Sequence, residues 1–156
     1  MNGQYVRYTY LANIAKFASN VVMMSGMNEN AALARIVVSD IYQSIKKNNE
    51  SFNDEALVNA AKEFCNGIDI VVNDINDSSN VSQPRETLMF KLFCFESYIT
   101  AKNMNEAEVA SVFVQNGIGT YLETVYNVIK TDNQHNIVLD IDIYIKAREV
   151  AHQSEL

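Results

Sequence analysis

The residues best able to do chemistry are few and lie far apart along the chain. His135 lies in the polar segment TDNQHN and His152 lies near the last residue, and neither has a second histidine or a cysteine at the spacing of a metal site. Cys65 and Cys94 each lie inside an apolar helical pattern, where reduced and buried cysteines are expected. These residues predict no metal site and no cofactor.

The carboxylates are no better arranged for catalysis. Asp140 and Asp142 are two residues apart, so on a helix they do not face each other, and we interpret them as charges at the start of a helix. Asp69, Asp74 and Asp77 lack the glycine and the regular alternation of a calcium loop. Because the sequence also lacks a phosphate-binding loop, a nucleophile elbow and a zincin helix, we predict a protein that is not an enzyme.

Helical periodicity dominates the elements that would position any site. Apolar residues recur at three- and four-residue spacing and predict an all-α compact bundle of about seven helices. The expected helices cover residues 5–24, 28–45, 53–75, 82–101, 105–116, 118–130 and 140–150. The segment NIVLDIDIYI also alternates with period two, which leaves a short strand over 136–143 open.

Several residues predict where helices begin and end. Gly26 is typical of a left-handed C-cap, and Asn28 is typical of an N-cap for the helix that follows. Asn105 and Glu108 have the spacing of a capping box, with Met104 placed to pack on Val109 as a hydrophobic staple. The polar segment NDINDSSNVSQPR holds the single proline and predicts a boundary between two helical halves, 1–78 and 79–156, within one compact unit.

The two halves contain a related motif. At an offset of 77 residues, Met27-Asn28-Glu29 aligns with Met104-Asn105-Glu106. The shared element is a helix, a tight turn and a second, capped helix, so we expect two related helix-turn-helix halves. A true duplication stays open, because Met-Asn-Glu is a favourable way to start any helix.

The composition excludes some partners. The 156 residues carry a formal net charge of −7, divided about evenly between the halves, and this field disfavours direct binding to phosphate backbones. No stretch is long and apolar enough to span a membrane, and no signal peptide is visible. We therefore expect a cytoplasmic protein whose acidic surface keeps it soluble or guides a basic protein partner.

One segment of the second half carries a family resemblance. The segment YNVIKTDNQHNIVLDI, from Tyr126 to Ile141, is similar to a signature of an uncharacterised bacterial family, domain of unknown function 3791, and the similarity extends over residues 88–150. The matching positions are Gly117, Ile118, Tyr126, Val128, Thr131, Val138, Asp140 and Ile141. The departures are Lys130, Asn133 and Asn136, where the family has His, Gly and Tyr. The resemblance implies a small helical module that is accessory to, or an antagonist of, a toxin-like partner of ADP-ribosyltransferase type.

Tyrosine is the residue in surplus, with eight in the chain, and it is favoured at protein interfaces. We predict a non-enzymatic protein-interaction module with a partner-binding face on the sixth and seventh expected helices, formed by Tyr121, Tyr126, Lys130, Asp132 and Asp140. One alternative is a phage or mobile-element inhibitor that uses acidic side chains to block a nucleic-acid-binding site. Another is a structural homodimer through Tyr5, Tyr8, Val22 and Met23. A small hydrolase or transferase would need a polar pocket with a perturbed acid or base.

Overall fold

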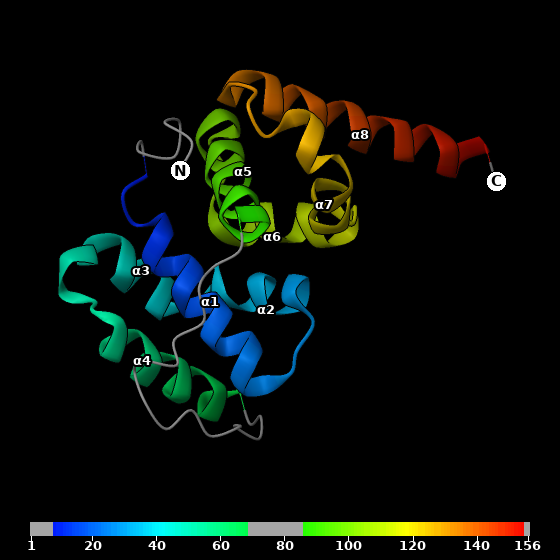
Figure 1. Ribbon diagram of the computed structural model, residues 1–156. Helices are drawn as coiled ribbons and strands as arrows, with labels where there is room; N and C mark the ends of the chain where they lie inside the picture. The colour runs from blue at the N-terminus through cyan, green and yellow to red at the C-terminus, as the bar shows by residue number, and fades with distance from the viewer. Residues whose placement is uncertain (1–7, 69–85, 155–156) are drawn as a thin grey trace.

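The computed structural model describes residues 8–68 and 86–154 as an all-α protein (Figure 1). These residues form eight α-helices and a short 3-10 helix, η2 (Asn49–Ser51), and they contain no strand. The α-helices are α1 (Leu11–Ser25), α2 (Glu29–Ile36), α3 (Asp40–Lys47), α4 (Asp54–Gly67), α5 (Glu86–Lys102), α6 (Glu106–Gln115), α7 (Ile118–Ile129) and α8 (Gln134–Ser154). The all-α prediction is confirmed, with one helix more than expected.

The additional helix arises because the expected helix over 28–45 is interrupted. α2 ends at Ile36 and α3 begins at Asp40. Ser39 has an extended backbone, and its hydroxyl oxygen accepts a hydrogen bond from the amide of Tyr42 at 3.4 Å, while Asp40 places a negative charge in the first turn. A local N-cap signal therefore outweighs the apolar spacing that continues through these residues.

The last helix begins earlier than expected. α8 starts at Gln134, and the side chain of Asn133 accepts a hydrogen bond from the amide of Asn136 at 2.9 Å. Asp140 and Asp142 consequently lie inside the helix, so their interpretation as helix-start charges is wrong. The short strand over 136–143 is not formed either.

The period-two pattern of this segment has a different consequence on a helix. Ile137 and Ile141 are fully buried, whereas Leu139 is 44% exposed and Ile143 is 66% exposed. Alternate residues on a helix lie about 200° apart, so the pattern distributes apolar side chains over two opposite faces. α8 therefore has an inner apolar face against the core and an outer apolar face toward solvent.

The predicted caps are confirmed. Gly26 is left-handed with φ of 72°, and the side chain of Asn28 accepts from the amides of Asn30 and Ala31. Asn105 and Glu108 form the capping box. Asn53 caps α4, which ends at Gly67. The expected continuation to residue 75, and the expected helix start at Ser82 and Pro84, lie outside the described residues.

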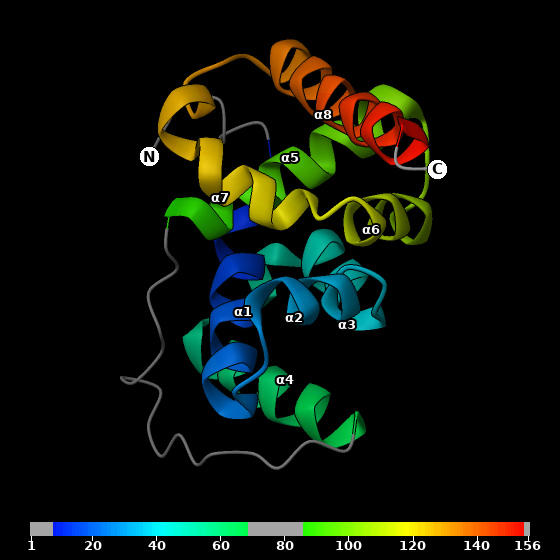
Figure 2. The same ribbon diagram turned by 90° about the vertical axis from the view of Figure 1, so that its right-hand side faces the viewer.

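The helices form two groups, α1–α4 and α5–α8, in both views (Figures 1 and 2). α5 is the central element and contacts α1, α6, α7 and α8. One continuous cluster of buried side chains extends from Leu11 in α1 to Ile141 in α8 and so joins both groups. The predicted division at residues 78 and 79 falls outside the described residues and stays a prediction.

The order of helices repeats between the groups. α2 and α6 begin 77 residues apart, and α1, α3 and α4 begin within three residues of the positions that this offset predicts from α5, α7 and α8. Gly26 and Asn103, also 77 apart, both have positive φ, 72° and 53°, in the turn before the capped helix. Equivalent helices contact each other, α1 with α5 and α2 with α6. The order of the helices and the positive φ in the turn therefore repeat between the two groups.

Candidate functional site

Three of the five predicted partner-binding residues lie together where α7 meets α8. The ring of Tyr121 stacks on that of Tyr144 with centroids 4.0 Å apart. Burial and the neighbouring carboxylate of Asp132 raise the pKa of Asp140. Burial and the charge of Asp140 raise the pKa of Tyr121. Tyr121, Asp132 and Asp140 therefore form one electrostatically coupled group.

The other two predicted residues, Tyr126 and Lys130, form a second group, and Tyr126 packs against the start of α5. The hydroxyl of Tyr126 donates to Oε2 of Glu86 at 2.9 Å, and its ring packs edge-on against Phe90. Burial and this hydrogen bond raise the pKa of Tyr126. Nζ of Lys130 lies 5.4 Å from the centre of the Tyr126 ring. The five residues thus divide into two groups, one against α8 and one against α5, and are not held together as a single cluster.

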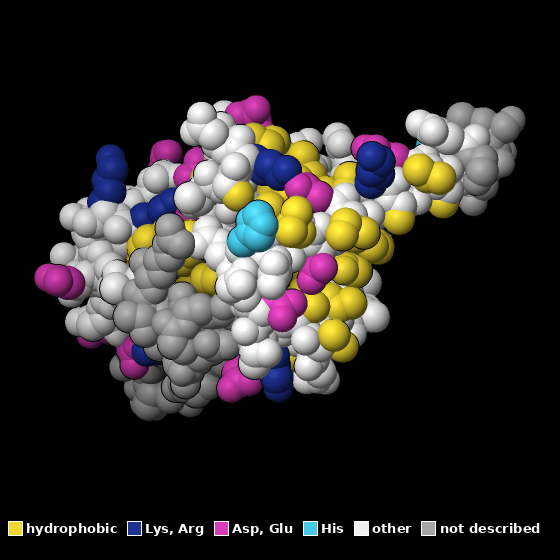
Figure 3. Space-filling view, turned by 90° about the horizontal axis from the view of Figure 1, so that it is seen from above, with side chains coloured by type: hydrophobic (Ala, Val, Ile, Leu, Met, Phe, Trp, Pro, Cys, Tyr) yellow, Lys and Arg dark blue, Asp and Glu magenta, His cyan; other side chains and the backbone are white. Residues whose placement is uncertain are grey.

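The first group continues into an apolar stripe along α7. Tyr121, Val125 and Val128 follow at i, i+4 and i+7, which places them on one face of the helix. Val128 is 78% exposed, the largest exposure among the exposed large hydrophobic residues of the described chain. Seen from above, hydrophobic side chains gather along α8 and over the adjoining region of α7 (Figure 3). We call Tyr121, Val125, Val128, Asp132 and Asp140 the α7 face.

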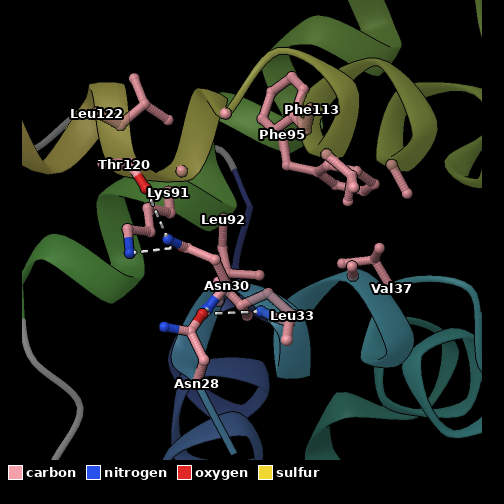
Figure 4. A pocket seen from close by; sticks show the side chains of 16 residues that line it. Asn28, Asn30, Leu33, Val37, Lys91, Leu92, Phe95, Phe113, Thr120 and Leu122 are labelled. Atoms are coloured by element: carbon pink, nitrogen blue, oxygen red, sulfur yellow. Dashed lines mark hydrogen bonds between the residues drawn. The ribbon is translucent and has the colours of Figure 1, made fainter.

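A pocket of about 350 Å³ lies between the two groups of helices (Figure 4). α2 forms one wall, α5 forms the floor, and α6 and the first turn of α7 form the opposite wall. Its apolar part is lined by Leu33, Val37, Leu92, Phe95, Phe113 and Leu122. Its size is within the range of small-ligand sites, but it is also the size of a recess for one or two partner side chains.

The polar end of this pocket is a buried ion cluster centred on Lys91. The side chain of Lys91 is 4% exposed, and its Nζ donates to Oε2 of Glu29 at 2.6 Å, to Oδ1 of Asn30 at 2.8 Å and to Glu123. An ammonium group has three N–H donors, and here all three have acceptors. Lys91 is therefore a satisfied structural cation, and it offers the pocket no vacant charge for acid–base chemistry.

A second ion cluster lies around Glu96 of α5. The carboxylate of Glu96 accepts from the hydroxyl of Tyr42 and pairs with Nζ of Lys46 at 3.1 Å. Lys46 also pairs with Glu106 at 3.5 Å, and Gln43 donates to Glu106 at 2.9 Å. Burial alone would raise the pKa of Glu106, but the hydrogen bond from Gln43 and the charge of Lys46 outweigh it and lower that pKa.

The sequence analysis did not predict either ion cluster, although the sequence contains an indication of both. Lys91 and Glu96 are two charges within the apolar run MFKLFCFES of the helix expected over residues 82–101. A charged residue at such a position must be paired when it is buried. Their partners lie in other helices and have no recognisable spacing in the sequence.

The two cysteines are buried as expected, and the two histidines lie at the surface. Cys65 and Cys94 are free and buried, and burial raises the pKa of both thiols, which disfavours reactive thiolates. His135 and His152 are exposed on α8. Among residues 8–68 and 86–154, no three of the His, Cys, Asp and Glu side chains come together in a group that could hold a metal ion.

The residues of the proposed homodimer patch are largely engaged within the fold. The Tyr8 ring packs edge-on against Phe93, and its hydroxyl accepts from Nε2 of Gln134 at 3.2 Å. Val22 packs against the core, and Met23 is 44% exposed. Tyr5 lies outside the described residues. Among the described residues of this patch, Met23 therefore has the largest surface left for contact with a second copy.

The fold and the pocket define an all-α protein built from two similar groups of four helices. Residues 89–148 match the model of a family described as "Protein of unknown function (DUF3791)", which confirms the resemblance over the second half and leaves the first half outside the match. No curated protein and no solved structure matches the chain. In the described parts of the chain, no helix combines the length and apolar content needed to cross a bilayer.

Proposed function

We propose that the protein is a non-enzymatic module that binds a protein partner through the α7 face. The observation that carries this proposal is the exposure of Val128 in line with Tyr121 and Val125. Large apolar side chains gathered on one face, beside a rim of charge, are typical of protein-interaction surfaces. Tyr121 adds an amphipathic ring that is already held in place by its stack on Tyr144, so little side-chain entropy is lost on binding.

The rim of the α7 face favours a partner with basic side chains. Asp132 and Asp140 are close enough for their like charges to raise the pKa of Asp140. A lysine or arginine from the partner, placed between them, would relieve this repulsion and bring the pKa of Asp140 back down. Binding should therefore strengthen as pH rises through the titration of Asp140 and weaken at high salt.

The class of partner stays a prediction. The family resemblance implies a toxin-like protein of ADP-ribosyltransferase type, and the acidic rim is compatible with a basic protein of that kind. The alternative of an acidic inhibitor of a nucleic-acid-binding site requires a continuous row of carboxylates. The face shown in Figure 3 instead has acidic side chains interspersed with basic and apolar ones, which favours the first proposal.

Capture from the native host, followed by binding measurements on the purified partner, tests the proposal. We expect Val128→Asp to weaken binding at least tenfold, while Val38→Asp, at another exposed valine on the α2–α3 connection, leaves it unchanged. Asp132→Lys should weaken binding and reduce its salt dependence. Binding that survives both α7 substitutions, or an enzymatic activity of the purified chain, would contradict the proposal.

A further inference from the structure

The outer face of α8 is apolar although the fold does not require it. Leu139, Ile143 and Val150 are 44%, 66% and 58% exposed and lie on one stripe of the helix, opposite the buried Ile137 and Ile141. From Lys146 to the last described residues of α8, every side chain is exposed. In Figure 1 this part of α8 extends beyond the other helices. The stripe therefore continues from the body of the protein onto a projecting helical end.

The equivalent helix of the first half serves as an internal control. The buried residues Leu57, Val58 and Ala61 of α4 have the same spacing as Ile137, Val138 and Ile141 of α8. With the helices aligned in this way, the positions of Leu139 and Ile143 correspond to Asn59 and Glu63. Both are polar and exposed. A fourth helix can therefore pack in this kind of bundle with a polar outer face, and the apolar face of α8 needs another explanation.

We propose that this outer face binds the same face of a second copy, with the two α8 helices antiparallel. The spacing of the stripe is symmetric about a point between Tyr144 and Ile145. An antiparallel pair centred there places Leu139 opposite Val150 of the second copy and Ile143 opposite Lys146, whose alkyl stem covers apolar surface while its ammonium group reaches solvent. The projecting end of each copy would then lie over the attached half of the other.

The charges of α8 fit this arrangement. Lys146 lies at the edge of the stripe nearer to Asp142, so in the antiparallel pair Lys146 of one copy comes beside Asp142 of the other. Asp142 is 32% exposed and already accepts from Tyr98 and pairs with Lys102, which fixes its position. A parallel pair would instead place Lys146 beside Lys146. The Asp142–Lys146 pair therefore favours a second copy in the antiparallel orientation.

The expected dimer is weak. Two helices in contact over about three turns bury on the order of 1,000 Å², which is at the low end for specific interfaces. The dimer dissociation constant should therefore be in the micromolar range. Sedimentation velocity over a concentration series should detect the dissociation. This inference goes beyond the proposed function and uses residues outside the α7 face, so either can fail without the other.

Substitutions on the stripe test the interface. Ile143→Glu should leave the circular dichroism spectrum unchanged, because the side chain is exposed, and should raise the dimer dissociation constant at least tenfold. Lys146→Glu should raise it by a smaller factor that high salt diminishes. The matched controls are Val38→Glu and Lys47→Glu, which change exposed residues elsewhere and should leave the dimer intact. A chain that is monomeric at all accessible concentrations, or a dimer that Ile143→Glu leaves unchanged, would overturn the proposal.

Single cysteines test the orientation. In the antiparallel pair, residue 139 of one copy faces residue 150 of the other, while two copies of residue 139 are about 16 Å apart along the axis, too far for a disulfide. A mixture of Leu139→Cys and Val150→Cys proteins should therefore cross-link under mild oxidation, whereas each alone should not. The native Cys65 and Cys94 are buried and should not contribute. Cross-linking of each single variant with itself, and no disulfide between residue 139 of one variant and residue 150 of the other in the mixture, would show parallel helices and overturn the arrangement.

Discussion

The first half of the protein presents polar side chains at positions where the second half presents apolar ones. On α7 and the outer face of α8 these positions hold Tyr121, Val125, Val128, Leu139 and Ile143. The corresponding residues of the first half lie 77 positions earlier for α7 and 80 positions earlier for α8, and they are Ser44 on α3, Asn48 and Ser51 just after it, and Asn59 and Glu63 on α4. Both halves contribute to the same buried core. Val128, Leu139 and Ile143 are exposed, whereas Tyr121 and Val125 are partly buried against the core. The difference between the halves supports the proposal that the interaction surfaces lie on the second half.

The interior joins the halves through charges as well as through apolar contacts. Glu29 and Glu106 are the first residues of the equivalent helices α2 and α6, and each pairs with a lysine of the opposite half, Lys91 and Lys46 respectively. Two similar ion pairs thus cross the interface between halves. Removing one of these ion pairs tests whether the stability of the protein depends on the charges that join the two halves.

The largest effect is expected for Lys91→Met. The substitution removes the buried ammonium group that lies 2.6 Å from the Glu29 carboxylate, and breaking such a pair costs about 3 kcal/mol of unfolding free energy. Lys16→Met is the control, because Lys16 pairs with Asp54 at the surface, where such pairs contribute about 0–1 kcal/mol. Urea titrations of both variants measure the difference. Equal costs would show that the Lys91 cluster does not hold the halves together.

A somewhat smaller effect, about 2 kcal/mol, is expected for Tyr42→Phe, because it removes a hydrogen bond to the buried carboxylate of Glu96. The variant should also change the alkaline limb of the stability curve. Burial and the charge of Glu96 raise the pKa of Tyr42, so above about pH 10 the unfolded chain loses a proton that the folded protein retains, and stability falls as pH rises. Denaturant titrations at several alkaline pH values should show a shallower fall for Tyr42→Phe. An unchanged slope would exclude Tyr42 as a contributor.

A third prediction concerns a close approach of the halves beside the pocket, between Gly119 and Asn30. A Cβ added at Gly119 would lie 2.3 Å from Oδ1 of Asn30, an atom held by Lys91. Gly119→Ala should therefore destabilise the protein by about 1 kcal/mol despite the better helix propensity of alanine. Combined with Asn30→Ala, the same substitution should cost less, because the clash is removed. A double-mutant cycle without coupling would show that the clash relaxes freely.

The sequence was sufficient for the fold class and for most helix boundaries, because these depend on local signals. Asn28 and Asn105 cap helices as their positions predict, and Gly26 ends one. The interruption at Ser39 was missed although Ser-Asp is itself a local start signal, since the apolar spacing on either side of it was given more weight.

The candidate site was predicted less well, for two physical reasons. The partners of Lys91 and Glu96 depend on how helices distant in sequence pack, and no spacing encodes that. The alternating pattern over residues 136–145 predicted either a short strand or a helix that begins at Asp140. A helix with two apolar faces produces the same pattern. Tyr121, Asp132 and Asp140 were predicted together, and the charge of Asp140 is coupled both to Tyr121 and to Asp132.

The most direct test of the two-faced helix compares Ile141→Ala with Ile143→Ala in dilute solution, where the chain is monomeric. Ile141 is fully buried and Ile143 is 66% exposed, although they are two residues apart on α8. The account predicts a loss of about 3 kcal/mol of unfolding free energy for Ile141→Ala and a change within about 0.5 kcal/mol for Ile143→Ala. Similar losses for both, measured by urea unfolding, would show that the outer face of α8 belongs to the core and would contradict its role in docking.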